Sequence, residues 1–350
     1  MNALLEKYFE LIRGLIPSKP EGNSIGLDIG AGDCKLVELA KTEKGITLMN
    51  WAIEPIQDGK VSEAVKNILE RVDNSYKALY TSVFGKGTLI RYIDMPYMSI
   101  DDLRNSFSIE ADKYFPFVQD QIYTDCFILE TTGKGKQMPV MAAATKKDII
   151  DRRVKLLNEL EISVNFIGIN SVALANVIHA LGVDDENKDA AVALLDMGNS
   201  VSNLTIMVNK LPRFTRDIFM GGRELTKRIS NALGIGLQEA EQLKNNPQKR
   251  KEEILDVCES AVMNIVQELR LSFDYFTTEK NTEISKLLLT GGGSMLEGIA
   301  EIFSKHLDMD VCQWNPLSRL EISPEVDQKA VSKDSLKLGV AVGLALYDYD

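Results

Sequence analysis

Cysteine and histidine are scarce in this sequence, and their spacing argues against two common kinds of site. The 350 residues include four cysteines, which lie far apart and form no CxxC pair, and only two histidines. Disulfide frameworks and structural zinc sites both need several such residues at short, regular spacings. We therefore expect neither a disulfide-stabilised domain nor a zinc-binding module.

Long apolar runs and an excess of positive charge are also missing. No run approaches the roughly 20 residues that a membrane-spanning helix needs, and the N-terminus lacks the uninterrupted apolar core of a secretory signal. The chain has 40 Lys and Arg against 51 Asp and Glu, a formal net charge of −11. Because so acidic a chain does not suit general nucleic-acid binding, these absences predict a cytoplasmic protein without a nucleic-acid partner.

What the sequence does contain is the composition of a globular protein. Apolar residues make up 45% of the chain and charged residues 26%. A chain of this length exceeds one small hydrophobic core, so two lobes or domains are expected.

The first residues, 1–23, form a segment of their own. Apolar side chains recur there at helical spacing, and Pro17 then ends the predicted amphipathic helix. Such a helix could dock on the body of the protein or in the groove of a neighbour, lie on a membrane surface, or act as a flexible arm. The apolar positions are Leu4, Leu5, Tyr8, Phe9, Ile12, Leu15 and Ile16.

Short strands alternate with helices through the rest of the chain, which predicts an α/β fold. In the first half, strands are expected at 25–27, 35–39, 47–51, 78–84, 88–94, 122–129, 139–144 and 163–169, and helices at 61–72, 103–114, 147–160 and 172–181. The acidic stretch 183–189 marks a boundary. A second set of strands follows, then a helical region at 222–275, a strand at 286–290, and helices from 295 and at 336–347.

Two hairpins repeat one pattern. In "SIGLDIGAGDCKLVEL" and in "AVALLDMGNSVSNLTIM" a buried strand ends in an aspartate, a glycine follows within two residues, and a polar turn leads into a return strand. The aspartates are Asp28 and Asp196. Two halves built on the same hairpin predict pseudo-symmetric lobes that close on one ligand.

These turns suit a phosphorylated ligand. Glycines let backbone N–H groups approach phosphate oxygens closely, Asp28 could hold a metal-bound water, and Lys35 could neutralise phosphate charge. A single Asp-x-Gly turn can equally close a plain hairpin. The third element, "LLLTGGGSMLEGIAEIF", is a strand, three glycines and a helix, which could pass close to a flat ring or a phosphate or could simply pack tightly.

Taken in this order, the three elements resemble the actin-like ATPase superfamily. Within it the chain is similar to the PilM family of type IV pilus assembly proteins, through "DMPYMSIDDLRNSFSIEADKYFPFVQDQIYTDCFIL", "GINSVALANV", "FTRDIFMGGRELTKRI" and "EAEQLK", from about residue 24 to the end. The resemblance implies an α/β, actin-like ATPase fold of two pseudo-symmetric lobes with an FtsA/PilM-type inserted subdomain. The implied parts are a first lobe at 24–94 and 161–182, the inserted subdomain at 95–160, a second lobe at 189–225 and 285–350, and a helical subdomain at 226–284.

The resemblance also implies a cleft for ATP and Mg²⁺ between the lobes. Asp28 and Asp196 would hold the metal through water. Glu241 and Lys244 match a helix that touches the ribose or adenine in relatives, although they could instead form a solvated helix face. The implied nucleotide-binding residues are Asp28, Gly30, Gly32, Asp33 and Lys35 in the first phosphate turn, Asp196, Gly198, Asn199 and Ser200 in the second, and Gly291, Gly292, Gly293 and Ser294 over the adenosine.

The sequence departs from the family pattern at two places. Ala31 and Asp33 stand where relatives often carry serines, and the added negative charge opposes phosphate binding unless Mg²⁺ screens it. Asn170 stands where many active relatives have a carboxylate, and Asn cannot act as a general base. Both departures favour a nucleotide-binding scaffold with weak or absent ATP hydrolysis.

As its partner, the resemblance implies the cytoplasmic N-terminal peptide of PilN, an inner-membrane protein, bound in a groove between the first lobe and the inserted subdomain. Membrane association at the inner face would then be indirect. The candidate groove residues, each of which could instead belong to the core of the subdomain, are Met95, Met98, Leu103, Tyr114, Phe115 and Phe117.

Three other functions remain open at this point. One is a related role in type II secretion, and another is an FtsA-like, filament-forming cell-division protein that self-associates. The second would carry an amphipathic membrane helix at its C-terminus, whereas this sequence stops at "GVAVGLALYDYD". The third is a small-molecule kinase, which would need a catalytic carboxylate that no motif of the first lobe supplies.

Overall fold

The computed structural model describes residues 22–72, 78–130, 137–183 and 190–349. The expected N-terminal helix, and all but the first residue of the acidic boundary stretch, lie outside these ranges. Within them, no helix combines the length and apolar character needed to cross a bilayer.

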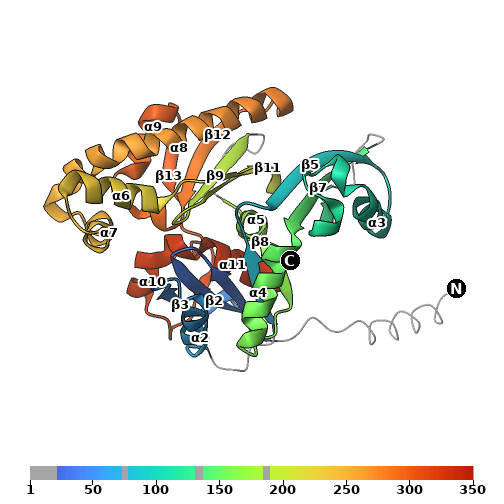
Figure 1. The fold of residues 1–350 in the computed structure, drawn as a ribbon, viewed down its shortest axis with the longest axis horizontal. Helices are drawn as coiled ribbons and strands as arrows, with labels where there is room; N and C mark the ends of the chain where they lie inside the picture. Colours follow the sequence, from blue (N-terminus) through green and yellow to red (C-terminus); the bar gives the residue numbers. More distant parts are fainter. Residues whose placement is uncertain (1–21, 73–77, 131–136, 184–189, 350) are drawn as a thin grey trace.

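The first lobe is built on a six-stranded sheet in the order β14-β3-β2-β1-β4-β8 (Figure 1). The apolar side chains on one face pack against helices α2 (Val61–Leu69) and α4 (Lys147–Glu159). Those on the other face pack against α5 (Asn170–Leu181), α10 (Gln328–Asp334) and α11 (Gly339–Ala345). The strands are β1 Ser24–Ile29, β2 Asp33–Thr42, β3 Gly45–Pro55, β4 Ala78–Val83, β8 Phe166–Ile169 and β14 Glu321–Ile322.

The second lobe repeats this plan with a five-stranded sheet in the order β11-β10-β9-β12-β13. Helices α6 (Gly222–Leu233), α8 (Lys251–Lys280) and α9 (Ile299–Leu307) pack on its outer face, and α7 (Leu237–Asn245) packs against α6. Its inner face shares a core with α5 and α11. These two helices therefore lie between the two sheets. The strands are β9 Ala191–Met197, β10 Ser202–Val208, β11 Leu211–Ile218, β12 Ile284–Thr290 and β13 Asp310–Gln313.

The strand registers confirm the predicted pseudo-symmetry. In the first hairpin Asp28 lies opposite Lys35, and in the second Asp196 lies opposite Asn203. The first strand of each hairpin also has a parallel neighbour on its other side, β4 for β1 and β12 for β9. Both aspartates therefore stand at equivalent ends of equivalent strands.

The inserted subdomain is a three-stranded sheet in the order β5-β7-β6, with helix α3 (Ile100–Glu110) on one face. Its strands are β5 Thr88–Pro96, β6 Ile122–Ile128 and β7 Gln137–Lys146. β5 begins before the expected boundary at residue 95 and pairs with β7 rather than with the first sheet. Conversely, α4 follows β7 without a break and packs Leu157 into the core of the first lobe.

Several helix boundaries differ from the sequence expectation, and glycines explain two of them. The helix expected from Met295 begins at Ile299, because Gly298 has a φ of 92° and residues Gly292–Met295 form a 3₁₀ turn. The helical region expected at 222–275 is three helices, the first of which ends at Gly234 with a φ of 65°. α8 also continues to Lys280.

Helix α11 fits between the sheets only because two glycines leave room for backbone. A Cβ on Gly343 would overlap the Ala173 carbonyl of α5, and one on Gly26 of β1 would overlap the Ala341 carbonyl of α11. The obstacle is backbone in both cases, which cannot rotate away as a side chain can. The close crossing of α5 and α11 therefore depends on Gly343, and the close packing of α11 on β1 depends on Gly26.

Gly343→Ala is accordingly predicted to destabilise the protein by about 3 kcal/mol through overpacking, measured as the free energy of unfolding in urea. The matched control is Gly236→Ala, since Gly236 has a negative φ and open space around its Cβ direction. Equal stability of the two variants would contradict the proposed crossing.

Candidate functional site

A cleft of about 560 Å³ lies between the lobes and is lined from both of them. The first hairpin turn, the second hairpin turn, the glycine run after β12 and helix α7 all contribute to its wall. Of the predicted nucleotide-binding residues, every one except Ser294 lines this cleft.

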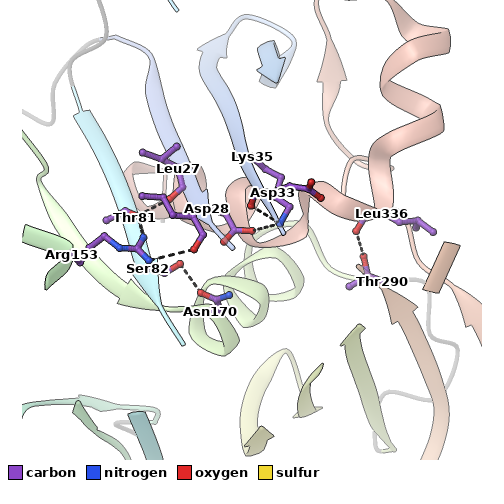
Figure 2. A network of polar contacts seen from close by, with 11 residues as sticks. Leu27, Asp28, Asp33, Lys35, Thr81, Ser82, Arg153, Asn170, Thr290 and Leu336 are labelled. Carbon is purple, nitrogen blue, oxygen red and sulfur yellow. Dashed lines mark hydrogen bonds and ion pairs between the residues drawn. The ribbon is translucent and has the colours of Figure 1, made fainter. Parts of the chain in front are cut away.

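The first turn is organised around Lys35 (Figure 2). Its ammonium lies 3.3 Å from Asp28 Oδ2 and donates to the Asp33 carbonyl at 3.3 Å, while the Gly30 N–H donates to the same carbonyl at 3.0 Å. Burial alone would lower the pKa of Lys35, but the negative charges of Asp28, Asp33 and Asp196 outweigh it and raise the pKa above its ordinary value. Lys35 is thus a fixed cation at the mouth of β2.

Lys35 compensates the charges of the two hairpin aspartates only in part. Burial, with repulsion from Asp28, raises the pKa of Asp196 to about 7, although Lys35 opposes the shift. Asp28 Oδ1 is buried and has no hydrogen-bond partner among the described residues. One ammonium group therefore serves two carboxylates.

This donor set fits a hard divalent cation. Carboxylate oxygens are the ligands that Mg²⁺ prefers, and the ion usually binds one or two of them while keeping much of its water shell. An added positive charge would partner the orphaned Asp28 oxygen and stabilise Asp196 in its ionised form. No group of three or more His, Cys, Asp or Glu that could enclose a metal occurs in the described part of the chain, so such an ion would need water or ligand oxygens.

The glycine run after β12 presses against the second hairpin turn. Gly291 has a φ of 85°, and a Cβ there would overlap Asp196 Oδ1; a Cβ on Gly293 would lie 2.9 Å from the Met197 carbonyl. Glycine is therefore required at Gly291 both for its backbone conformation and for space. The backbone of this run lines the cleft without side chains, which leaves room for a ring or a phosphate.

Ser294 lies differently from the other predicted residues. Its side chain is fully buried, and its hydroxyl donates to the Gly291 carbonyl at 2.8 Å. It stabilises the glycine turn from within and does not face the cleft.

Glu241 and Lys244 form one hydrogen-bonded network at the wall of the cleft, in which the Lys244 side chain is buried and the Glu241 side chain is 46% exposed. The Lys244 ammonium is 2.7 Å from Glu241 Oε2 and donates to Thr226 Oγ1 at 2.9 Å and to the Gly222 carbonyl at 3.3 Å. All three of its donors are thus used within the protein. Burial would raise the pKa of Glu241, but the charge and hydrogen bond of Lys244 hold it below its ordinary value.

Glu241 is therefore the residue of this pair that presents an ionised carboxylate to the cleft, and Lys244 positions it. The alternative of a solvated helix face does not hold for Lys244, which is only 4% exposed.

Sequence reasoning missed cleft residues that come from distant segments. Lys337 follows α10, pairs with Asp334 at 2.8 Å and packs its side chain beside Gly292. Thr226 and Arg223 come from α6. No local pattern marks these residues, because only the fold brings them to the glycine run.

Asn170 lines the cleft at the start of α5. Its side-chain oxygen accepts a hydrogen bond from the Ser82 hydroxyl at 2.7 Å (Figure 2). Its position facing the cleft matches that expected of the family carboxylate, but an amide cannot take up a proton from water there.

The predicted partner residues divide into two groups. Met95, Leu103 and Phe115 are buried in the core between α3 and the inserted sheet, so they are unavailable to a partner in this structure. Met98, Tyr114 and Phe117 are partly buried against the same core. For the three buried residues the structure favours the alternative interpretation, in which they form the core of the subdomain.

The opposite face of the inserted sheet is more open. Strand alternation places Tyr123 and Phe127 of β6 on it, next to Met141 of β7 and Tyr92 of β5. Tyr123 is 48% exposed and Phe127 58% exposed. We call this surface, defined by Tyr92, Tyr123, Phe127, Pro139 and Met141, the open sheet face.

At its β5 side the open sheet face borders a cavity of about 200 Å³ against the second lobe. Tyr92, Asp94 and Pro139 line it from the inserted sheet, and Arg213 and Phe276 line it from the second lobe. Because side chains of both the subdomain and the lobe form the walls, the shape of this cavity depends on how the two are oriented.

Solved structures identify the fold as actin-like. The ethanolamine utilization protein EutJ from Carboxydothermus hydrogenoformans is 15% identical, with a TM-score of 0.56 and coverage of 98% of each chain. MreB 5 of Spiroplasma citri, solved with bound AMPPNP, is 11% identical, with a TM-score of 0.51 and coverage of 94% of this chain and 97% of that one. The protein is thus a member of the class built on two actin-like lobes.

A nearer likeness is to a chain of the PilM-PilN type IV pilus biogenesis complex, with a TM-score of 0.82, 22% identity, and coverage of 95% of this chain and 100% of that chain. The family described as type IV pilus assembly protein PilM matches residues 26–349. The chain belongs to this family.

The buried carboxylate Asp196 gives a pH-dependent prediction for the protein without metal or ligand. Its pKa is about 7 in the folded chain and about 3.8 when unfolded, so between these pH values the folded state retains a proton that the unfolded state has lost. Stability from this group therefore falls as pH rises from about 4 to 7 and is constant above that.

Asp196→Asn should remove this loss. The free energy of unfolding of the variant should exceed that of wild type at pH 8, and this advantage should be smaller at pH 5. Urea unfolding in a chelating buffer measures both values. Asp256→Asn, on an exposed position of α8, is the control and should show no such difference. A wild-type advantage that grows with pH would refute the prediction.

Proposed function

We propose that this protein is an ATP-binding adaptor of type IV pilus assembly that acts on the cytoplasmic side of the inner membrane and binds the N-terminal peptide of a PilN-like protein. The observation that carries the proposal is the cleft, in which two carboxylates, one fixed lysine and three glycine-containing turns meet. Membership of the PilM family supports the cellular role.

In the cleft, the backbone N–H groups of the two hairpin turns would bind phosphate oxygens, and the Lys35 ammonium would neutralise part of their charge. Asp28 and Asp196 would hold Mg²⁺ through water, and its charge would offset the negative charge of the phosphates. The glycine run and Lys337 would cover the base, and the ionised Glu241 would accept hydrogen bonds from ribose hydroxyls. Residues from both lobes thus have a part, which makes binding sensitive to lobe closure.

Hydrolysis is expected to be weak or absent. Asn170 lies where a catalytic carboxylate is expected, and its oxygen already accepts a hydrogen bond from Ser82. It can neither deprotonate water nor lend negative charge to a general base. The nucleotide would then act mainly as a ligand that stabilises one orientation of the lobes.

Asp33 sets the strength of nucleotide binding in this proposal. Its side chain faces the cleft beside the first turn, and only its backbone carbonyl takes part in holding Lys35 and Gly30. The carboxylate adds negative charge where phosphates would lie, so it weakens binding and makes Mg²⁺ more important.

The partner would dock on the open sheet face. A chain of this architecture is solved in the PilM-PilN complex, and extended or helical peptides commonly bind across exposed apolar surfaces. The exposed rings of Tyr123 and Phe127 would anchor the peptide, and the cavity beside Arg213 would receive one of its side chains. Met98, Tyr114 and Phe117, on the far side of the sheet, would then support the subdomain more than contact the peptide.

Calorimetry with ATP and Mg²⁺ tests the nucleotide site. Wild type should bind, Asp196→Ala should lose binding, and Asp33→Ser should bind more tightly by about 1 kcal/mol, roughly fivefold, because one repelling charge is gone. Asp256→Ser controls for a change of net charge alone. If wild type fails to bind and Asp33→Ser does not restore binding, the nucleotide site is refuted.

Binding of a synthetic PilN-type N-terminal peptide tests the partner site. Phe127→Ala should weaken it at least about tenfold, as removal of an aromatic anchor usually does, with no loss of stability because the ring is exposed. Ile109→Ala is the matched control: this residue is 69% exposed in the same subdomain but lies on α3. Equal peptide affinities for the two variants would refute this docking face.

A further inference from the structure

Helix α4 connects the inserted subdomain to the first lobe. It begins at Lys147, directly after the last residue of β7, and the Lys146 N–H donates to the Gly87 carbonyl before β5 at 2.8 Å. The start of β5 and the end of the central strand β7 are thus tied together where the helix starts. A shift of this sheet must therefore move the first turn of α4.

The two sides of α4 contact different parts of the protein. Lys147 and Asp151, one turn apart, face Tyr123 of the open sheet face: the Lys147 ammonium lies 5.4 Å from the ring centroid, and the Tyr123 hydroxyl donates to Asp151 Oδ1 at 3.3 Å. Arg153 and Leu157, also one turn apart, lie on the opposite side of the helix, toward the first lobe. One rigid helix therefore touches both the partner face and the core beneath the cleft.

Arg153 reaches the strand that carries the phosphate turn (Figure 2). Its guanidinium donates to the Ile29 carbonyl at 3.3 Å and to Thr81 Oγ1 at 3.1 Å, and the Thr81 hydroxyl donates to the Leu27 carbonyl at 2.7 Å. Ile29 is the last residue of β1 and immediately precedes Gly30. Arg153 therefore holds the backbone at the point where the strand becomes the turn.

This contact compensates for a gap in the sheet. The parallel pairing of β1 with β4 ends at Leu27 and Thr81, so β4 offers no partner to the Ile29 carbonyl. A buried carbonyl without a partner costs free energy, and the guanidinium supplies the missing donors. The positive charge of the guanidinium also interacts favourably with the carboxylate of Asp28.

We propose that Arg153 is a positioning residue through which the inserted subdomain sets the geometry of the first phosphate turn. Occupancy of the open sheet face and occupancy of the cleft then change each other's affinity through α4, and by the same factor in both directions. The coupling between the two ligands rests on the proposed function, whereas the contact by which Arg153 holds the turn does not.

The test compares Arg153→Met with Arg152→Met. Arg152 is the neighbouring arginine of α4, but it is exposed and pairs with Asp148 at 2.9 Å. Hydrogen exchange of the amides of residues 30–35, without any ligand, should be faster in Arg153→Met and unchanged in Arg152→Met. Arg153→Lys, which keeps a donor, should restore part of the protection.

Calorimetry then measures the linkage. In wild type and in Arg152→Met, saturation with the PilN-type peptide should change the Kd for ATP and Mg²⁺ about fivefold or more, the usual range of such couplings. In Arg153→Met the change should fall below about twofold. Tyr123→Phe keeps the ring but removes the contact with Asp151, and should reduce the linkage without touching the arginine.

The outcomes separate the two claims. The role of Arg153 is overturned if the amides of residues 30–35 exchange at the wild-type rate in Arg153→Met. It is also overturned if Arg153→Met binds both ligands and the peptide still changes the Kd for ATP and Mg²⁺ as in wild type. If Arg153→Met does not fold, the test uses Arg153→Lys and Tyr123→Phe instead. If the peptide then changes the Kd for ATP and Mg²⁺ in both variants as much as in wild type, the proposed role of Arg153 is overturned. Failure of wild type to bind ATP or peptide refutes the proposed function instead, and the exchange comparison alone then decides whether Arg153 holds the turn.

Discussion

One lysine shared between two buried carboxylates is the constraint on which the site depends. Asp28 and Asp196 come from hairpins of different lobes, and their negative charges meet near the single ammonium of Lys35. Two carboxylates brought together at low solvent exposure repel each other, and Lys35, with the Arg153 guanidinium near Asp28, offsets this only in part, since the pKa of Asp196 stays raised. In the proposed function, a ligand that carries a divalent metal would offset this repulsion, and both lobes would take part because each contributes one of the two charges.

The architecture turns this local charge balance into a property of the whole molecule. Helices α5 and α11 share hydrophobic cores with both sheets, and Gly343 lets them cross closely because it has no side chain. Backbone packs directly on backbone in this middle layer, which favours a rigid contact. A change in the relative orientation of the lobes would therefore be expressed at the ends of the strands, where the hairpin turns line the cleft.

Local chemistry explains which features were predictable from sequence. The two Asp-x-Gly turns and the glycine run are continuous in the chain, so their pattern revealed both hairpins, the pseudo-symmetry and almost all of the predicted cleft residues. Lys337 and Arg153 reach the site from distant helices, and no local spacing marks them. Ser294 illustrates a different limit, since a serine beside a glycine turn can face either way. The apolar residues from Met95 to Phe117 show a third: the family resemblance and their apolar character made them candidates for the groove, but neither could tell the covered face of the inserted sheet from its open one.

An amide at Asn170 is compatible with a working adaptor. A ligand shifts a conformational equilibrium by the difference between its affinities for the two states, and no bond needs to break for this. Hydrolysis adds direction only when the product binds differently and leaves. In the proposed role, a nucleotide that stays bound would hold one orientation of the lobes, and an amide in place of a general base at Asn170 would lengthen that time. In the same proposal the negative charge of Asp33 would act in the opposite sense, because it would weaken binding of the phosphates. The two departures from the family pattern together favour a site whose occupancy follows nucleotide concentration instead of a catalytic cycle.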